Sequence, residues 1–163
     1  MAFSPEIKLP TIVVADSNPA NLDLFEDLLA YEGYEVICVN NGEEALQAVY
    51  RSLPNLLITE VALPKVDGLT LSEKIRSDKS LKWMPLLAIT ALRQKDRPQQ
   101  IEAAGFDGFL VKPFKEEALK ATIRSYLEEG REPANLTKER FCNKRLSKLT
   151  FLPKMGFSEG VYA

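Results

Sequence analysis

The stretch Leu56-Leu-Ile-Thr-Glu60 is a short apolar run that ends in an acidic residue. Similar runs recur along the chain between longer amphipathic segments, at residues 11–15, 35–39, 86–89 and 109–111. Their Val, Ile and Leu content, without polar alternation, is typical of strands that are buried on both faces of a parallel sheet. We therefore predict five parallel strands, of which residues 56–59 form the third.

The segments between these runs carry apolar residues at the spacing of an α-helix. Five helices are predicted, around residues 24–29, 45–50, 71–75, 101–104 and 118–127. Asn18-Pro19 supplies a cap and a first-turn proline for the first helix, and Gly33 and Gly130 stand where helices are expected to end. The alternation of strands and helices predicts a doubly wound α/β domain.

Charge divides the chain into two parts. Residues 1–130 hold 14 basic and 20 acidic side chains, whereas residues 131–163 hold 7 and 3. Of the 163 residues, 45% are hydrophobic, which excludes a mostly disordered chain. We predict an N-terminal arm at residues 1–10, the α/β domain at residues 11–130 and a basic C-terminal extension at residues 131–163.

The chain contains no histidine, which removes the commonest general base and the commonest zinc ligand. Its two cysteines, Cys38 and Cys142, form no metal-binding spacing and suggest no disulfide framework. Cys38 is expected to act as a small hydrophobic residue of the second strand. No segment has the character of an export signal or the apolar length of a membrane span, so we expect a cytoplasmic protein.

Ligands of doubly wound folds bind at the carboxyl ends of the strands. The residues just after the predicted strands therefore form the candidate site, namely Asp16, Ser17, Glu60, Thr90, Ala91 and Lys112. A nucleotide-binding or flavin-binding enzyme is disfavoured, because the loop at residues 16–21 has no glycine that would let the backbone approach a phosphate.

Four motifs lie in order at these strand ends. They are Val14-Ala-Asp16-Ser17-Asn-Pro19, Pro54-Asn-Leu-Leu-Ile-Thr-Glu60-Val-Ala-Leu-Pro64-Lys-Val-Asp67-Gly68-Leu69, Ile89-Thr90-Ala91 and Phe106-Asp-Gly-Phe109-Leu-Val-Lys112-Pro113-Phe114. Together they resemble the receiver domain of two-component response regulators, over residues 11–130. The resemblance implies a flavodoxin-like sheet with the strand order 2-1-3-4-5 and a cis peptide bond before Pro113.

The resemblance also implies a reaction, in which an aspartate after the third strand takes a phosphoryl group from a partner's phosphohistidine. In the family, that aspartate and two acids after the first strand hold one Mg²⁺ ion. A lysine and a hydroxyl neutralise and hydrogen-bond the transferred group. Asp16, Thr90 and Lys112 match this pattern, whereas Glu60 at the acceptor position and Ser17 at the second acid position depart from it.

These two departures predict a degenerate pseudo-receiver that works without phosphorylation and is not an enzyme. Glutamate reaches further than aspartate by about 1.5 Å, and a misplacement near 1 Å can cost on the order of a hundredfold in rate. Ser17 removes a carboxylate, so no cofactor is expected, and any Mg²⁺ at Asp16 and Glu60 would be weakly bound. We expect the Glu60 carboxylate to lie toward Lys112 and Thr90 and to mimic the phosphorylated state. The alternative is a working phosphoacceptor in a phosphorelay.

Structural roles stay open for several of these residues. Thr90 could cap the turn after the fourth strand, and Asp16 could cap the first helix, although Asn18 is better placed for that role. Phe109 occupies the position of the family's switch aromatic and could equally be a core residue. Lys112 could be a surface lysine, but its place at the end of an apolar strand favours the phosphate-side role.

The basic extension contains a predicted amphipathic helix, with apolar residues at helical spacing among cations. The residues expected to contact a partner are Lys138, Arg140, Phe141, Lys144, Arg145, Leu146 and Leu149. The helix could fold back on the acidic domain, dock on another protein, or bind nucleic acid or lipid. The acidic excess of residues 1–130 favours the first two.

The resulting hypothesis is a stand-alone signalling module that acts by protein contact. We expect contacts through the basic extension and through the fourth helix, fifth strand and fifth helix, which are also the candidate face for a dimer. The expected partner is a protein, such as a histidine kinase or an effector. Nucleic acid is disfavoured, because the extension is too short for a separate winged-helix domain.

Overall fold

The computed structural model describes residues 7–92 and 96–129. The predicted helix stop at Gly130 and the predicted basic helix of the extension lie outside these residues. Within the described ranges, no helix combines the length and the apolar character needed to cross a membrane.

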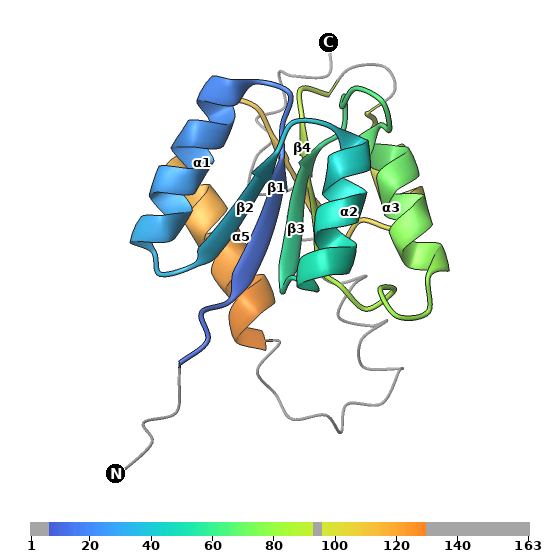
Figure 1. Ribbon diagram of the computed structural model, residues 1–163. Coiled ribbons are helices and arrows are strands. Elements are labelled where there is room, and N and C mark those ends of the chain that lie inside the picture. The colour runs from blue at the N-terminus through green and yellow to red at the C-terminus, as the bar shows by residue number, and fades with distance from the viewer. Residues whose placement is uncertain (1–6, 93–95, 130–163) are drawn as a thin grey trace.

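Five strands and five helices alternate along the described chain, as predicted (Figure 1). In chain order they are β1 (Thr11–Ala15), α1 (Pro19–Tyr31), β2 (Glu35–Val39), α2 (Gly42–Ser52), β3 (Leu56–Glu60), α3 (Gly68–Ser77), β4 (Leu86–Thr90), α4 (Pro98–Ala103), β5 (Gly108–Val111) and α5 (Glu116–Glu129).

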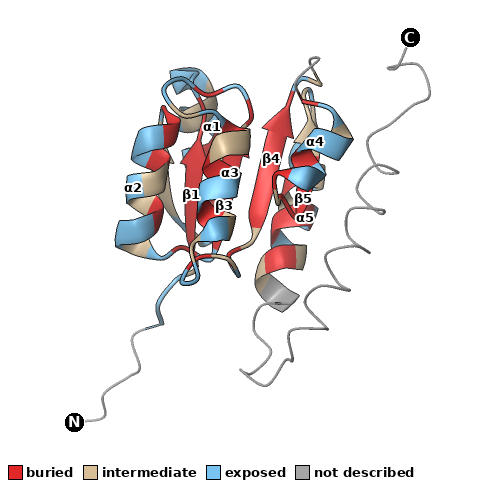
Figure 2. Ribbon diagram, turned by 90° about the vertical axis from the view of Figure 1, so that its right-hand side faces the viewer, coloured by how far each residue is buried: buried red, intermediate tan, exposed pale blue. Residues whose placement is uncertain are grey.

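All neighbouring strands pair in parallel, and the order β2-β1-β3-β4-β5 confirms the order that the family resemblance implies. Helices α1 and α5 lie on one side of the sheet, and α2 and α3 lie on the other (Figure 1). Each side has its own buried apolar cluster, and alternate residues of the central strands enter one cluster or the other. The central strands are thus buried on both faces, as their continuous apolar character predicts (Figure 2).

Strand β2 departs from this pattern. It is an edge strand, Glu35 is exposed, and the rest of the strand is only partly buried, because helices cover an edge less completely than the centre. Cys38 lies in this strand and donates through its thiol to the carbonyl of Leu22, 3.7 Å away. Partial burial, aided by nearby Glu26 and Asp23, raises the pKa of the Cys38 thiol to about 11, so the group is protonated at neutral pH.

Local signals set where the helices begin. Asn18 caps α1 by accepting from the Ala20 amide, as expected, and Asn41 and Asp67 cap α2 and α3 in the same way. Gly68 opens α3 directly against the end of β3, where a Cβ atom would lie 2.6 Å from the Glu60 carbonyl oxygen. A side chain at this position would therefore push α3 away from the strand that carries Glu60.

A buried charged pair joins α3 to the start of β4 and β5. Arg76 donates to Asp107 over 2.8 Å, and its other nitrogens donate to three backbone carbonyls, those of Lys82, Met84 and Gly105. Asp107 also accepts from the Leu86 amide over 2.8 Å. The guanidinium therefore satisfies polar groups of the α3–β4 and α4–β5 connections at once.

The Arg76–Asp107 pair yields a stability prediction. Replacing Arg76 by Met leaves the buried Asp107 carboxylate without its cation, so the free energy of unfolding is expected to fall by about 3–5 kcal/mol. Lys74→Met, on an exposed position of the same helix, is the matched control and should stay within about 0.5 kcal/mol. Urea denaturation at pH 7 measures both, and equal losses for the two variants would contradict the role given to Arg76.

Candidate functional site

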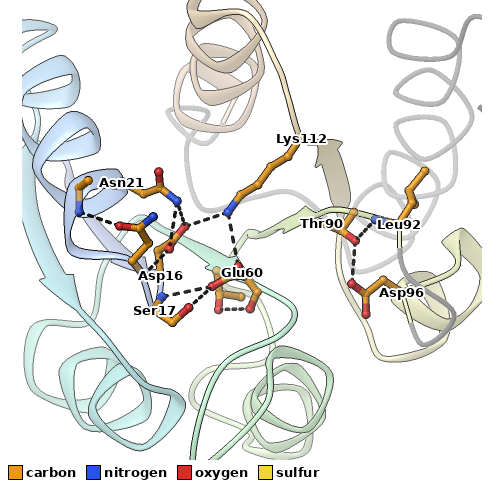
Figure 3. Close-up of polar contacts among 11 residues, drawn as sticks. Asp16, Ser17, Asn21, Glu60, Thr90, Leu92, Asp96 and Lys112 are labelled. Atoms are coloured by element: carbon orange, nitrogen blue, oxygen red, sulfur yellow. Dashed lines mark hydrogen bonds and ion pairs between the residues drawn. The ribbon is translucent and has the colours of Figure 1, made fainter.

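The candidate site lies where β1, β3, β4 and β5 end. Parallel pairing places Ala15 beside Thr59, and Glu60 beside Ile89, so the residues that follow β1 and β3 meet at one edge of the sheet. Figure 3 shows Asp16, Ser17, Glu60 and Lys112 turned toward one another at this edge. The Lys112–Pro113 peptide bond is cis, as the family resemblance implies.

Both carboxylate oxygens of Glu60 have donors. Ser17 donates to Oε2 twice, from its backbone nitrogen at 3.1 Å and from its hydroxyl at 2.9 Å. Lys112 Nζ lies 3.4 Å from Oε1. We call these three residues the Ser17–Glu60–Lys112 cluster. The expected contact between Glu60 and Lys112 is present, and the contact with Ser17 was not expected from the sequence.

Asp16 lies beneath this cluster and is almost fully buried, with 2% of its side chain exposed. Its carboxylate accepts from the backbone nitrogen of Asn18 at 2.8 Å and from the side-chain amide of Asn21 at 3.2 Å. Lys112 Nζ donates to the same carboxylate over 3.2 Å. Asp16 is therefore a hydrogen-bonded anion of the site, and Asn18, not Asp16, supplies the α1 cap.

Thr90 is turned away from Glu60 (Figure 3). Its hydroxyl donates to Asp96 Oδ2 at 3.0 Å and accepts from the Leu92 backbone nitrogen at 2.9 Å. A hydroxyl has one proton to donate, so the bond to Asp96 uses the donor that the expected contact with the Glu60 carboxylate would need. In this conformation Thr90 stabilises the turn after β4, and Ala91, next in the chain, is exposed.

Phe109, at the position of the family's switch aromatic, is 3% exposed. It packs in the apolar cluster between the sheet and α2, α3 and α4. Its ring therefore has the buried arrangement in this structure, which agrees with the core role considered from the sequence.

The donor atoms differ from those of the magnesium site that the family resemblance implies. The position of the second acid is Ser17, so the carboxylates of Asp16 and Glu60 stand alone there, and the Lys112 ammonium lies within hydrogen-bonding distance of both. Mg²⁺ is usually bound in near-octahedral geometry by one or two carboxylates together with several waters. Among residues 7–92 and 96–129, no three His, Cys, Asp or Glu side chains are grouped so that they could hold a metal ion.

Two residues of the site were missed from the sequence. Asn21 was overlooked, although the Asn18-Pro19 helix start places it in the first turn of α1, near the end of β1. No pattern in the sequence pointed to Asp96, because its contact with Thr90 depends on how the β4–α4 connection folds.

Comparison with known proteins agrees with this geometry. The family model for the response regulator receiver domain matches residues 12–124 and ends before the basic extension. The polar-differentiation response regulator DivK of Brucella anthropi is 32% identical over 120 residues, which cover 74% of this chain and 98% of that protein.

Solved structures show the same fold. A response regulator structure from Chloroflexus aurantiacus has 34% identity and a TM-score of 0.69, and the match covers 74% of this chain and 99% of that one. The receiver domain of a sensor histidine kinase from Pseudomonas aeruginosa, solved with a magnesium ion coordinated in its active-site cleft, has 26% identity and a TM-score of 0.68, covering 74% of this chain and 98% of that one.

The fold, the strand-end residues and these matches all lead to one assignment. The chain belongs to the response regulator receiver domain family, whose members are non-enzymatic modules of two-component signalling.

Proposed function

We propose that this chain is a pseudo-receiver, a receiver domain that signals by protein contact without taking up a phosphoryl group. The observation that carries the proposal is the Ser17–Glu60–Lys112 cluster, in which the side chain at the acceptor position is already bound by three donors. An attacking carboxylate must be free to approach a phosphorus atom in line. Glu60 would have to give up its bonds to Ser17 or Lys112 before it could do so.

The two departures from the family pattern compensate each other chemically. A carboxylate at position 17 would face the longer side chain of Glu60, and two like charges in contact would repel. Serine instead presents a hydroxyl, which donates to Glu60 over 2.9 Å. Ser17 and Glu60 thus form a matched pair, and with serine at position 17 the site has one carboxylate fewer than the family's magnesium site.

Lys112 supports the same proposal. Its ammonium lies 3.2 Å from Asp16 and 3.4 Å from Glu60, so one positive charge offsets part of the charge of the two carboxylates. We propose that the Glu60 carboxylate takes the place of a phosphoryl group at Lys112, but not at Thr90, whose hydroxyl is bound to Asp96. Mg²⁺ binding at Asp16 and Glu60 would then be weak or absent.

Receiver domains interact with kinases and effectors, and we propose that this chain does so through two surfaces. One is the face formed by α4, β5 and α5, which could also join two copies. The other is the basic extension at residues 131–163, with its cations and its apolar residues Phe141, Leu146 and Leu149. We place this role in the cytoplasm, because the two cysteines suggest no disulfide framework.

Phosphotransfer is the direct test of the proposal. We expect no stable phosphoryl adduct by intact-mass analysis after incubation of the wild-type chain with Mg²⁺ and acetyl phosphate. Ser17→Asp combined with Glu60→Asp restores the family's acids and is expected to gain a Mg²⁺-dependent adduct. This double variant shows that the donor and buffer are competent. A wild-type adduct mapped to Glu60 would instead establish a working phosphoacceptor.

A double-mutant cycle tests the bond between Ser17 and Glu60. Ser17→Ala and Glu60→Ala are expected to be coupled by about 0.5–1 kcal/mol in the free energy of unfolding, because each variant removes one partner of the same charged hydrogen bond. Thr90→Val with Glu60→Ala is the control cycle and should show less than half that coupling, since Thr90 bonds Asp96. Equal coupling in both cycles would refute the specific pairing.

Hydrogen exchange tests whether Glu60 holds the proposed output face. Glu60→Gln removes the charge that Lys112 contacts, so amides of β5 and α4 are expected to exchange faster than in the wild type. Glu73→Gln, on an exposed position of α3, is the control and should leave these amides unchanged. If Glu60→Gln also leaves them unchanged, Glu60 does not control this face.

A further inference from the structure

Strand β2 forms one edge of the sheet, with β1 as its neighbour on the inner side (Figure 1). Natural edge strands are usually protected against further pairing by lysine, proline, a bulge or short length. The sequence of β2, Glu35-Val-Ile-Cys-Val39, contains no lysine or proline, and its pairing with β1 runs over all five residues without a bulge. Of such devices in its own sequence, β2 has only the charge of Glu35.

The other edge strand, β5, is better protected. It has four residues, and Lys112 and Pro113 follow it directly. A lysine and a proline at the end of a short strand both oppose the addition of a further strand. Of the two edges of this sheet, β2 is therefore the one that is suited to pairing.

The backbone of β2 has hydrogen-bonding groups on its outer side. The Glu35 amide donates to the carbonyl of Pro10 over 2.9 Å, at the start of β1. Backbone groups of successive residues point to opposite sides of a strand, so the odd-numbered residues of β2 bond β1. The N–H and C=O groups of Val36 and Cys38 consequently face outward, where no strand of the described chain pairs with them.

A hollow of about 460 Å³ lies beside this edge, on the side of the sheet that α2 covers. Ile37 and Val39 of β2 line it, together with a stripe of α2 residues at helical spacing, namely Glu44, Gln47, Ala48 and Arg51. The stripe has an acid at one end and a cation at the other. Both are exposed, and neither forms an ion pair within the described residues.

This edge is self-complementary under a twofold rotation. A twofold axis perpendicular to the sheet at Ile37 lays a second β2 antiparallel to the first, with Val36 opposite Cys38 of the second copy. The same rotation reverses α2, so that Glu44 comes beside Arg51 of the second copy at both ends of the contact. Opposite charges would thus meet at the ends, and the apolar β2 side chains would meet between them.

We propose that two copies of this chain join edge to edge through β2 and α2. The outward N–H and C=O groups of Val36 and Cys38 bond each other across the axis, and the two five-stranded sheets become one continuous sheet. The α2 stripes of the two copies pack antiparallel over the joined strands. The inference goes beyond the pseudo-receiver and does not depend on Glu60. It leaves the face formed by α4, β5 and α5 for a protein partner.

The charges of the stripe also have a role within their own helix. Glu44 lies in the first turn of α2 and Arg51 in the last, and both positions suit the helix dipole. A role limited to the helix would change the stability of each copy and leave self-association unchanged. The test therefore measures association.

Sedimentation equilibrium of the full chain gives the dissociation constant of the dimer. Glu44→Lys and Arg51→Glu each bring like charges together at both ends of the contact, so each is expected to weaken the dimer by about tenfold or more. The two substitutions combined restore opposite charges and should return the dissociation constant to within about threefold of the wild type. Glu102→Lys, on an exposed position of α4, is the matched control and should have little effect.

Amide hydrogen exchange in the wild-type chain locates the contact without any substitution. The Val36 and Cys38 amides are expected to become more protected as the protein concentration rises, because a second β2 covers them in the dimer. The Ile37 amide already bonds β1 within one copy and should change less.

Several results would overturn the proposal. These are a chain that stays monomeric up to millimolar concentration, a double variant that associates no better than the single ones, and a dimer that Glu102→Lys weakens while the substitutions at positions 44 and 51 do not. Concentration-dependent protection that omits Val36 and Cys38 would place the contact elsewhere and overturn it as well.

Discussion

Parallel strand pairing is the constraint on which the rest of this structure depends. Because all five strands run the same way, their carboxyl ends lie at one edge, and the polar residues that follow β1, β3 and β5 are forced together. Asp16 is nearly buried by this arrangement, and a buried carboxylate needs hydrogen bonds and a counter-charge. Asn18, Asn21 and Lys112 supply them.

Hydrogen bonding at this edge links the two departures from the family pattern. Among the described residues, Asp16 and Glu60 both contact the Lys112 ammonium, and Glu60 also accepts from the backbone nitrogen and the hydroxyl of Ser17. A neutral donor at position 17 therefore suits a long acid at position 60. The same exchange leaves one carboxylate fewer than the magnesium site that the family resemblance implies.

The two sides of the sheet contribute differently to the proposed signalling role. The side with α2, α3 and α4 holds the larger apolar cluster, including Phe109, and the Arg76–Asp107 pair fixes its loops. The side with α1 and α5 is joined by Phe25, Phe114 and the pairing of Glu32 with Lys120 and Arg124, and it carries a mostly apolar hollow. These cations lower the pKa of the Glu32 carboxyl, so this link between α1 and α5 is retained at neutral pH.

The amino-acid sequence alone determined the order of strands and helices, the strand-end residues and the two substituted positions, because these follow from apolar periodicity and from motifs within short segments. It did not determine that Ser17 would donate to Glu60, that Thr90 would donate to Asp96, or that β2 would be only partly buried. The bond between Ser17 and Glu60 and the burial of β2 depend on the sheet order, whereas the bond between Thr90 and Asp96 depends on the path of the β4–α4 connection and on the one proton that a hydroxyl can donate. Only the tertiary structure decides which partner each hydroxyl bonds, because Glu60 and Asp96 are separated from Ser17 and Thr90 by connections whose course the sequence pattern does not predict.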